Sequence, residues 1–489
     1  MSTPVSDSAS GKSIEKGDAS VFESSVDSLD PEVVARAWRK VDWHVMPVAA
    51  ILYLSSYIDR ANIGNAKVLG MYKQLHLTDN QYSLALSIFF LGYVVFEVPS
   101  NIVVKKVGPA WYIPIMTMLW GGICALTSLV HSASGLATVR FFLGLTEAGF
   151  LPGIIFWIGS WYPRPLQGRR YAILYSSASL TGAFGGLLAT AIHTLDGVHG
   201  IAGWRWIYIV EGVITAGLGI VSFIFLSSDA ATAKWLTEEE RRAILLINES
   251  DRALKAKESF SGRQIKSAFT DWRIYLWGFM YITNYIPVYS VVLGLPTVIT
   301  GLGYKGTSAT LMSVPPYGLG FIIVLIAGWT TDKYGYKIIH YLVGITVVGI
   351  ALIVLMITTN LVARYVMFFL VMFMFIPVST MWAWIAQNIA GSNKRAAATG
   401  FIFSMGNIGG AISGQIYRAE WAPRYVESHA INFGCYVLAF ISGVIMWWSY
   451  RRDNQLRDKA AGRIVEKGDM LGEDLGELGD RHPSFRYYL

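Results

Sequence analysis

The charged residues of this 489-residue chain are concentrated in a few short stretches. The sequence contains 40 Lys and Arg and 33 Asp and Glu residues, and 46 of these 73 fall within 1–43, 227–273 and 451–489. The other 360 residues carry only 27 charges. Charged residues make up roughly 25% of an average soluble domain, which would be about 90 in a segment of this length. A long water-exposed chain needs more charge on its surface, so most of this chain is predicted to lie in lipid.

Apolar segments divide the charge-poor part of the chain. A helix needs about 20 apolar residues to cross the ~30 Å of hydrocarbon in a bilayer. Two sets of six such segments, separated by a charged loop, indicate a carrier built from two repeated halves. We therefore expect an all-α membrane protein with 12 transmembrane helices in two six-helix bundles. The predicted spans are 44–65, 82–104, 110–130, 136–160, 170–192, 205–226, 274–299, 309–331, 338–358, 363–389, 395–417 and 430–450.

The same pattern predicts the domain organisation. We expect a disordered tail, a first bundle, a central loop with a short helix at 237–248, a second bundle and a second tail. Lys and Arg are enriched in the loops on the side of the tails, and this bias places both termini and the central loop in the cytoplasm. The predicted regions are 1–43, 44–226, 227–273, 274–450 and 451–489.

An ionisable residue inside a predicted span costs roughly 2.5–3.5 kcal/mol to insert, and four of them in the first and fourth spans are candidates for one site. Asp59 and Arg60 lie in the first span, and Arg140 and Glu147 in the fourth. Seven residues are two helical turns, so Arg140 and Glu147 share a helix face but lie about 10 Å apart. Each should find a partner on another helix, and Asp59 and Arg60 are the candidates. The group forms either a structural ion-pair network or a binding site with a proton switch.

The switch interpretation follows from counting charges. Two arginines and two carboxylates are neutral together, and protonating one carboxylate leaves a positive charge that attracts an anion into a low-dielectric cavity. Proton and anion then favour each other's binding, which is the coupling that a symporter requires. Apolar neighbours make Glu147 the first candidate for the proton carrier, with Asp59 second.

A charged loop motif follows the eighth predicted span, over residues 328–337. Its spacing, Gly-x-x-x-Asp-Lys-x-Gly-x-Lys, places charges at helix ends, where charge pairing and helix-dipole contacts can hold one face of a carrier shut. We predict a cytoplasmic gate here and in the basic loop after the fourth span. The predicted gating residues are Asp332, Lys333, Lys337, Arg164, Arg169 and Arg170.

The 328–337 motif, the twelve spans and the Arg140–Glu147 spacing resemble the major facilitator superfamily. Within it, the chain resembles the anion:cation symporter family, and most of all the fungal allantoate- and nicotinate-type permeases. The resemblance covers about 44–450 and rests on YIDRANIGNA, EVPSN, RFFLGLTEAGFLPG and GWRWIYIVEG.

This resemblance implies roles for individual residues. Acidic residues that match Asp59 and Glu147 act in proton coupling in such transporters. Basic residues that match Arg60 and Arg140 act in anion binding or gating, and an asparagine that matches Asn407 contacts substrate. The resemblance also implies a fungal plasma membrane.

Aromatic and amide side chains recur on the seventh predicted span. Tyr281, Tyr285 and Tyr289 follow at intervals of four residues, beside Asn284. They either line the cavity and contact a flat carboxylate substrate, for which we name Tyr281, Asn284 and Tyr285, or pack as interfacial aromatics.

The sequence therefore predicts a monomeric, proton-coupled importer of a small organic anion, such as nicotinate. The coupling ion is a proton, and no further cofactor, metal or nucleic-acid partner is expected, because no assembled nucleophile, metal-ligand cluster, cofactor motif or dense basic face is present. The lack of an assembled nucleophile, metal-ligand cluster or cofactor motif in the sequence also argues against an enzyme. Two alternatives remain open at this stage: a proton-driven exporter of drugs or metabolites on the same fold, and a non-transporting nutrient receptor.

Overall fold

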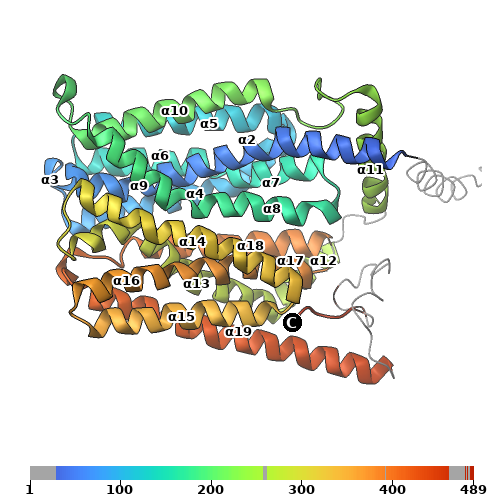
Figure 1. Ribbon diagram of the computed structural model, residues 1–489. Coiled ribbons are helices and arrows are strands. Elements are labelled where there is room, and N and C mark those ends of the chain that lie inside the picture. The colour runs from blue at the N-terminus through green and yellow to red at the C-terminus, as the bar shows by residue number, and fades with distance from the viewer. Residues whose placement is uncertain (1–28, 257–261, 391, 462–479, 481, 483–484) are drawn as a thin grey trace, which may run out of the picture.

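The computed structural model describes residues 29–256, 262–390, 392–461, 480, 482 and 485–489. Within these residues every regular element is a helix. The long helices run along one common axis in two groups, the N-terminal bundle above the C-terminal bundle in Figure 1. The N-terminal bundle consists of α2 (Pro31–Ala66), α4 (Asp79–Val107), α5 (Pro109–Leu126), α6 (Ala133–Glu147) continued by α7 (Phe150–Trp161), α8 (Arg164–Ser179) continued by α9 (Thr181–His193), and α10 (Gly203–Phe225).

Within the described residues, the N-terminal bundle has six helical passes, and the C-terminal bundle also has six. Short turns connect the helices of both bundles, namely η1 (Lys67–Met71), α3 (Tyr72–Gln74), η2 (Thr127–Leu129), η3 (Val198–Gly200) and η5 (Ala419–Trp421). The C-terminal bundle consists of α13 (Trp272–Thr300), α14 (Thr307–Tyr334), α15 (Lys337–Ile357), α16 (Leu361–Val371) continued by η4 (Met372–Met374) and α17 (Phe375–Asn388), α18 (Ser392–Ser413) and α19 (Val426–Ala461).

This architecture confirms the predicted all-α membrane fold of two six-helix bundles. Among the described residues, eight helical segments are long and apolar enough to cross a membrane by composition alone. The other four passes are α2, α4, α8 with α9, and α18, which carry more polar residues. Passes of this kind line the interior of a carrier, where polar groups are tolerated.

The first and last long helices of the chain, α2 and α19, are longer than the sequence predicted. Asp30 caps α2 by accepting a hydrogen bond from the Glu32 amide at 2.9 Å, and Pro31 occupies the first turn, where its missing N–H costs nothing. Residues 31–43 are therefore helical rather than part of a disordered tail, and α19 likewise continues past 450. A search for apolar segments misses such polar extensions.

The central loop contains the predicted helix as α11 (Glu238–Ala256), followed by α12 (Gly262–Thr270). Thr237 Oγ1 accepts a hydrogen bond from the Glu240 amide, and a Glu240 carboxylate oxygen accepts one from the Thr237 amide. This reciprocal pair is a capping box, which fixes the helix start. Both helices lie at one end of the bundles (Figure 1), which we call the loop end, and the opposite end is the far end.

The two bundles close on each other at the far end. Ser87 on α4 donates a hydrogen bond to the Ala411 carbonyl on α18 at 2.6 Å. Beyond it, Arg418 donates to Asn80 at 2.8 Å. Gly64 on α2 lies so near α13 that a Cβ atom would be 2.5 Å from the Leu293 carbonyl oxygen. Small residues are what allow helix backbones to approach this closely in membranes.

We expect Gly64→Ala to lower the free energy of unfolding by about 1–3 kcal/mol, because the added methyl group overpacks a rigid backbone contact. Thermal unfolding of the purified protein in detergent measures this change. Gly122→Ala is the matched control, since a Cβ atom at Gly122 meets no atom within 4 Å. Equal effects of the two substitutions would contradict the close approach of α2 and α13.

Candidate functional site

Arg60 lies where the two bundles meet. Its Nη2 forms an ion pair with the Glu147 carboxylate on α6. Its Nη1 donates a hydrogen bond to the Tyr289 hydroxyl on α13 at 3.0 Å. Arg60 is 6% exposed and Glu147 only 1%, so both charges depend on each other for compensation. One guanidinium therefore connects a buried carboxylate of the first bundle to a hydroxyl of the second.

Asp59 points away from this ion pair. Consecutive helical residues are separated by about 100° around the axis, and Asp59 accordingly faces α5 and α10. Its Oδ2 accepts hydrogen bonds from Trp120 Nε1 at 3.0 Å and from Thr215 Oγ1 at 2.9 Å. Cys124 Sγ lies 3.5 Å from its Oδ1. The Asp59 carboxyl is thus held by neutral donors inside the N-terminal bundle.

Arg140 is buried without the carboxylate partner that the sequence led us to expect. None of its three guanidinium nitrogens has a hydrogen-bond partner among the described residues. The guanidinium stacks over the Phe89 ring at 4.9 Å, and Glu147 lies within electrostatic range on the same helix. We expected Arg140 and Glu147 on α6 to find partners in Asp59 and Arg60 on α2. Glu147 pairs with Arg60, whereas among the described residues Arg140 forms no ion pair with Asp59.

A third buried carboxyl group, Glu211 on α10, belongs to the same interior. In the structure it is 4% exposed and accepts a hydrogen bond from Asn62 Nδ2. Asn62 follows Asp59 by three residues, so both face α10. An acidic residue in an apolar span was the available signal.

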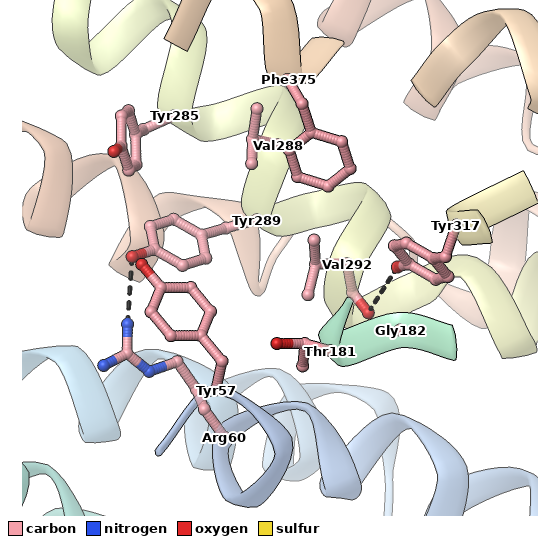
Figure 2. A pocket seen from close by; sticks show the side chains of 10 residues that line it. All are labelled: Tyr57, Arg60, Thr181, Gly182, Tyr285, Val288, Tyr289, Val292, Tyr317 and Phe375. Carbon is pink, nitrogen blue, oxygen red and sulfur yellow. Dashed lines mark hydrogen bonds between the residues drawn. The ribbon is translucent and has the colours of Figure 1, made fainter. Parts of the chain in front are cut away.

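A pocket opens beside Arg60, between the two bundles (Figure 2). The Tyr57 and Tyr289 hydroxyls lie together next to the guanidinium. Apart from Thr181, apolar and aromatic side chains form the rest of the wall, so the pocket combines one positive group with flat apolar surfaces. Its lining residues are Tyr57, Arg60, Thr181, Gly182, Tyr285, Val288, Tyr289, Val292, Tyr317 and Phe375.

The other predicted substrate-binding residues lie at different distances from this pocket. Tyr285 lines it, and Tyr281 stacks on Tyr285 with ring centroids 4.3 Å apart. Asn407 on α18 donates a hydrogen bond to Glu97 on α4 at 3.3 Å. This contact joins the two bundles through residues that do not line the pocket. Asn284 is turned toward α15.

The side chain of Asn284 points into the C-terminal bundle. Its Nδ2 donates hydrogen bonds to the Met280 carbonyl at 2.7 Å and to the Tyr341 hydroxyl at 2.9 Å. The residue is fully buried inside the C-terminal bundle. In this conformation it supports helix packing and does not line the pocket.

The predicted gating residues are distributed over the loop end. Arg170 pairs with Asp42 on α2 at 2.8 Å, a contact within the N-terminal bundle. Lys333 is exposed and lies over the Trp329 ring at 4.8 Å. Lys337 is buried, with its Nζ 5.5 Å from the Tyr488 ring centroid. The remaining side chains of this predicted set, those of Asp332, Arg164 and Arg169, lie outside what the structure describes.

Residues 485–489 pack onto the loop end of the C-terminal bundle. The Tyr488 carbonyl accepts hydrogen bonds from Trp384 Nε1 at 2.7 Å and Asn388 Nδ2 at 3.0 Å. The Leu489 carbonyl accepts one from the Lys337 amide at 3.1 Å. The sequence predicted only a cytoplasmic tail here, because short aromatic segments give no sign of where they pack.

A buried ion pair adds to this contact. Lys394 at the start of α18 lies 2.7 Å from Asp271 and 2.8 Å from Asp480. Burial raises the pKa of the Asp480 carboxyl, and the Lys394 ammonium opposes this shift. Among the described residues, no group of three His, Cys, Asp or Glu side chains is placed to hold a metal ion.

Sequence comparisons connect this architecture to known proteins. The profile of the Major Facilitator Superfamily matches residues 49–414. An uncharacterized transporter of Schizosaccharomyces pombe is 33% identical over 452 residues, which cover 91% of this chain and 93% of that protein. The MFS-type transporter cnsO of Penicillium expansum is 32% identical over 466 residues, covering 92% of this chain and 90% of its own.

Solved structures show the same fold. The proton:xylose symporter XylE superposes with a TM-score of 0.65 at 14% identity, over 84% of this chain and 96% of its own. A bacterial homolog of the human lysosomal transporter Spinster, in an inward-facing and unoccupied conformation, also reaches a TM-score of 0.65 at 14% identity, over 83% of this chain and 96% of its own. At this identity the likeness concerns the fold alone.

We expect Arg60→Gln to lower the free energy of unfolding by about 3–5 kcal/mol, because it leaves the Glu147 carboxylate buried and unpaired. The double substitution Arg60→Gln with Glu147→Gln should recover most of this loss. Thermal unfolding in detergent compares the two variants. Arg241→Gln removes the solvent-exposed pair with Glu238 and serves as a control with a far smaller effect. A double variant less stable than Arg60→Gln would rule out the ion pair.

Proposed function

The chain belongs to the Major Facilitator Superfamily and is a multi-pass membrane transporter rather than an enzyme, and from this premise we propose that it is a proton-coupled symporter that imports a small organic anion. The observation that carries the proposal is the position of Arg60. This buried cation is held by Glu147 in one bundle and by Tyr289 in the other, at the wall of the pocket between them.

Protonation of Glu147 provides the coupling step. The proton neutralises the carboxylate, and Arg60 then lacks a counter-charge in a site of low dielectric constant. A substrate carboxylate can replace Glu147 as the partner of the guanidinium, so proton and anion stabilise each other's binding. Asp59 is the second candidate for a proton carrier, and Arg140 is a second cation that an anion can approach.

The pocket favours a flat monocarboxylate. One guanidinium suits one carboxylate, while Tyr57, Tyr285 and Phe375 offer aromatic surfaces for a planar ring. Nicotinate has both properties. This substrate class agrees with the resemblance to the anion:cation symporter family and its fungal allantoate- and nicotinate-type permeases.

Transport proceeds by rocking of the two bundles. Because Arg60 and Tyr289 belong to different bundles, loading this site changes the contacts that hold the bundles together. We place the transporter in the plasma membrane as a monomer, with both termini, and thus the loop end, in the cytoplasm. Contacts such as Ser87 with Ala411 then close the external face, and the predicted gating residues lie at the cytoplasmic face.

Two alternatives make different predictions. A proton-driven exporter on the same fold moves its substrate against the incoming proton, so an inward proton gradient would empty loaded vesicles. A nutrient receptor binds its ligand without any flux. A proton-flux screen of the reconstituted protein against nicotinate, pantothenate, biotin, allantoate and phthalate separates all three functions.

We expect an outside acidic pH to accelerate uptake of radiolabelled nicotinate into vesicles that contain the wild-type protein. Glu147→Gln should abolish this pH dependence and the accumulation against a gradient, because the amide cannot exchange a proton. Exposed Glu238→Gln is the control and should behave as wild type. Persistent pH-driven accumulation by Glu147→Gln would remove Glu147 from the mechanism.

We expect Tyr289→Phe to raise the KM for the transported carboxylate by roughly 10-fold or more, because a hydrogen bond to a charged group is worth about 1.5–3 kcal/mol and Arg60 loses its positioning partner. Tyr317→Phe is the matched control in the same pocket, since Tyr317 donates its hydrogen bond to the Val292 carbonyl and not to Arg60 (Figure 2). Initial rates over a range of substrate concentrations test this difference, and identical KM values for the two variants would contradict it.

A further inference from the structure

Five ionisable groups lie deepest in the interior of the N-terminal bundle, and they do not balance in charge when all are ionised. Asp59, Glu147 and Glu211 are acidic, Arg60 and Arg140 are basic, and all five are at most 6% exposed. Full ionisation would leave one uncompensated negative charge in the interior of a membrane protein, which is strongly unfavourable. One proton on one of the three carboxyl groups removes this imbalance.

Hydrogen bonding indicates which carboxyl group is protonated. Glu147 is in direct contact with the Arg60 guanidinium, which favours the carboxylate. Asp59 accepts hydrogen bonds from an indole N–H and a hydroxyl and has a thiol beside its second oxygen. Donors to both oxygens also favour the ionised form. Glu211 is the group that remains.

The pairing of Glu211 with Asn62 is incomplete without a proton. Asn62 Nδ2 donates to Glu211 Oε2. Glu211 Oε1 and Asn62 Oδ1 are both buried and have no hydrogen-bond partner within the described residues. If Glu211 is ionised, its Oε1 and the Oδ1 of Asn62 are both acceptors, so neither can donate a hydrogen bond to the other. A proton on Oε1 makes it a donor to Oδ1, and the acid and amide then form two parallel hydrogen bonds.

The surrounding groups are compatible with a neutral Glu211. Asp59 from α2 and Cys124 from α5 lie within electrostatic range, as does Tyr208 on its own helix. Cys124 and Tyr208 also interact with Arg140 from α6. With Glu211 neutral, the charges of Asp59 and Arg140 cancel, as do those of Arg60 and Glu147.

We propose that Glu211 is a protonation site separate from Glu147. Glu211 carries its proton on Oε1 and shares it with Asn62 Oδ1. Its behaviour in transport rests on the proposed function: the proton stays on Glu211 throughout the cycle, because its loss would leave an uncompensated negative charge in the bundle. The protonation itself requires no substrate and is tested independently.

Infrared spectroscopy of the purified full-length protein at neutral pH detects the C=O band of a protonated carboxyl, which carboxylates lack. We expect Glu211→Gln to lose one such band relative to wild type and Asp59→Asn to retain it. The glutamine amide can repeat both hydrogen bonds to Asn62, so this variant should fold. Unchanged absorption in Glu211→Gln, or loss of the band in Asp59→Asn, would overturn the assignment.

Asn62→Leu gives a second measurement that does not alter the acid. The band should shift when its hydrogen-bond partner is removed, and an unshifted band contradicts the proposal even if Glu211→Gln fails to fold. In vesicles with nicotinate as probe, the number of protons taken up per substrate should be the same in Glu211→Gln and in wild type, and a ratio that falls by one contradicts retention of the proton on Glu211. Absence of proton uptake by the wild-type protein would disprove the symport function, whereas the infrared spectra still decide whether Glu211 is protonated.

Discussion

The cost of burying charge in a membrane governs the interior of this protein. Charged side chains are scarce in its spans, and the ones that remain must be compensated by a partner, by neutral donors or by a proton. Arg60 shows the first solution and Asp59 the second. Because each solution depends on neighbouring helices, the ionisable groups tie α2 to α5, α6 and α10.

Arg60 differs from the other buried groups because its partners belong to both bundles. Glu147 holds it from α6, and Tyr289 from α13. A group that only stabilised the N-terminal bundle would have no reason to contact the C-terminal one. The guanidinium thus gives a physical connection between the charge state of one bundle and its contact with the other, which alternating access requires.

Much of the fold was predictable from the sequence, because lipid allows little besides long apolar helices. The site was only partly predictable. Helical spacing separated Arg140 from Glu147 correctly, and Glu147 did find its partner on α2. Sequence could not show that Asp59 faces α10 or that Asn284 faces α15, since these orientations depend on how each helix is rotated within its bundle. The role given to Glu211 depends on contacts with Asn62, which no sequence spacing encodes.

The packing of residues 485–489 has a consequence for biosynthesis. These residues contact Trp384 and Asn388 on α17 and Lys337 on α15, yet they are translated after every helix they touch. The C-terminal bundle therefore reaches its final packing at the loop end only after this segment has left the ribosome. A premature stop codon shortly before 485 would leave the twelve spans unchanged and still deprive that bundle of the segment that contacts both α15 and α17.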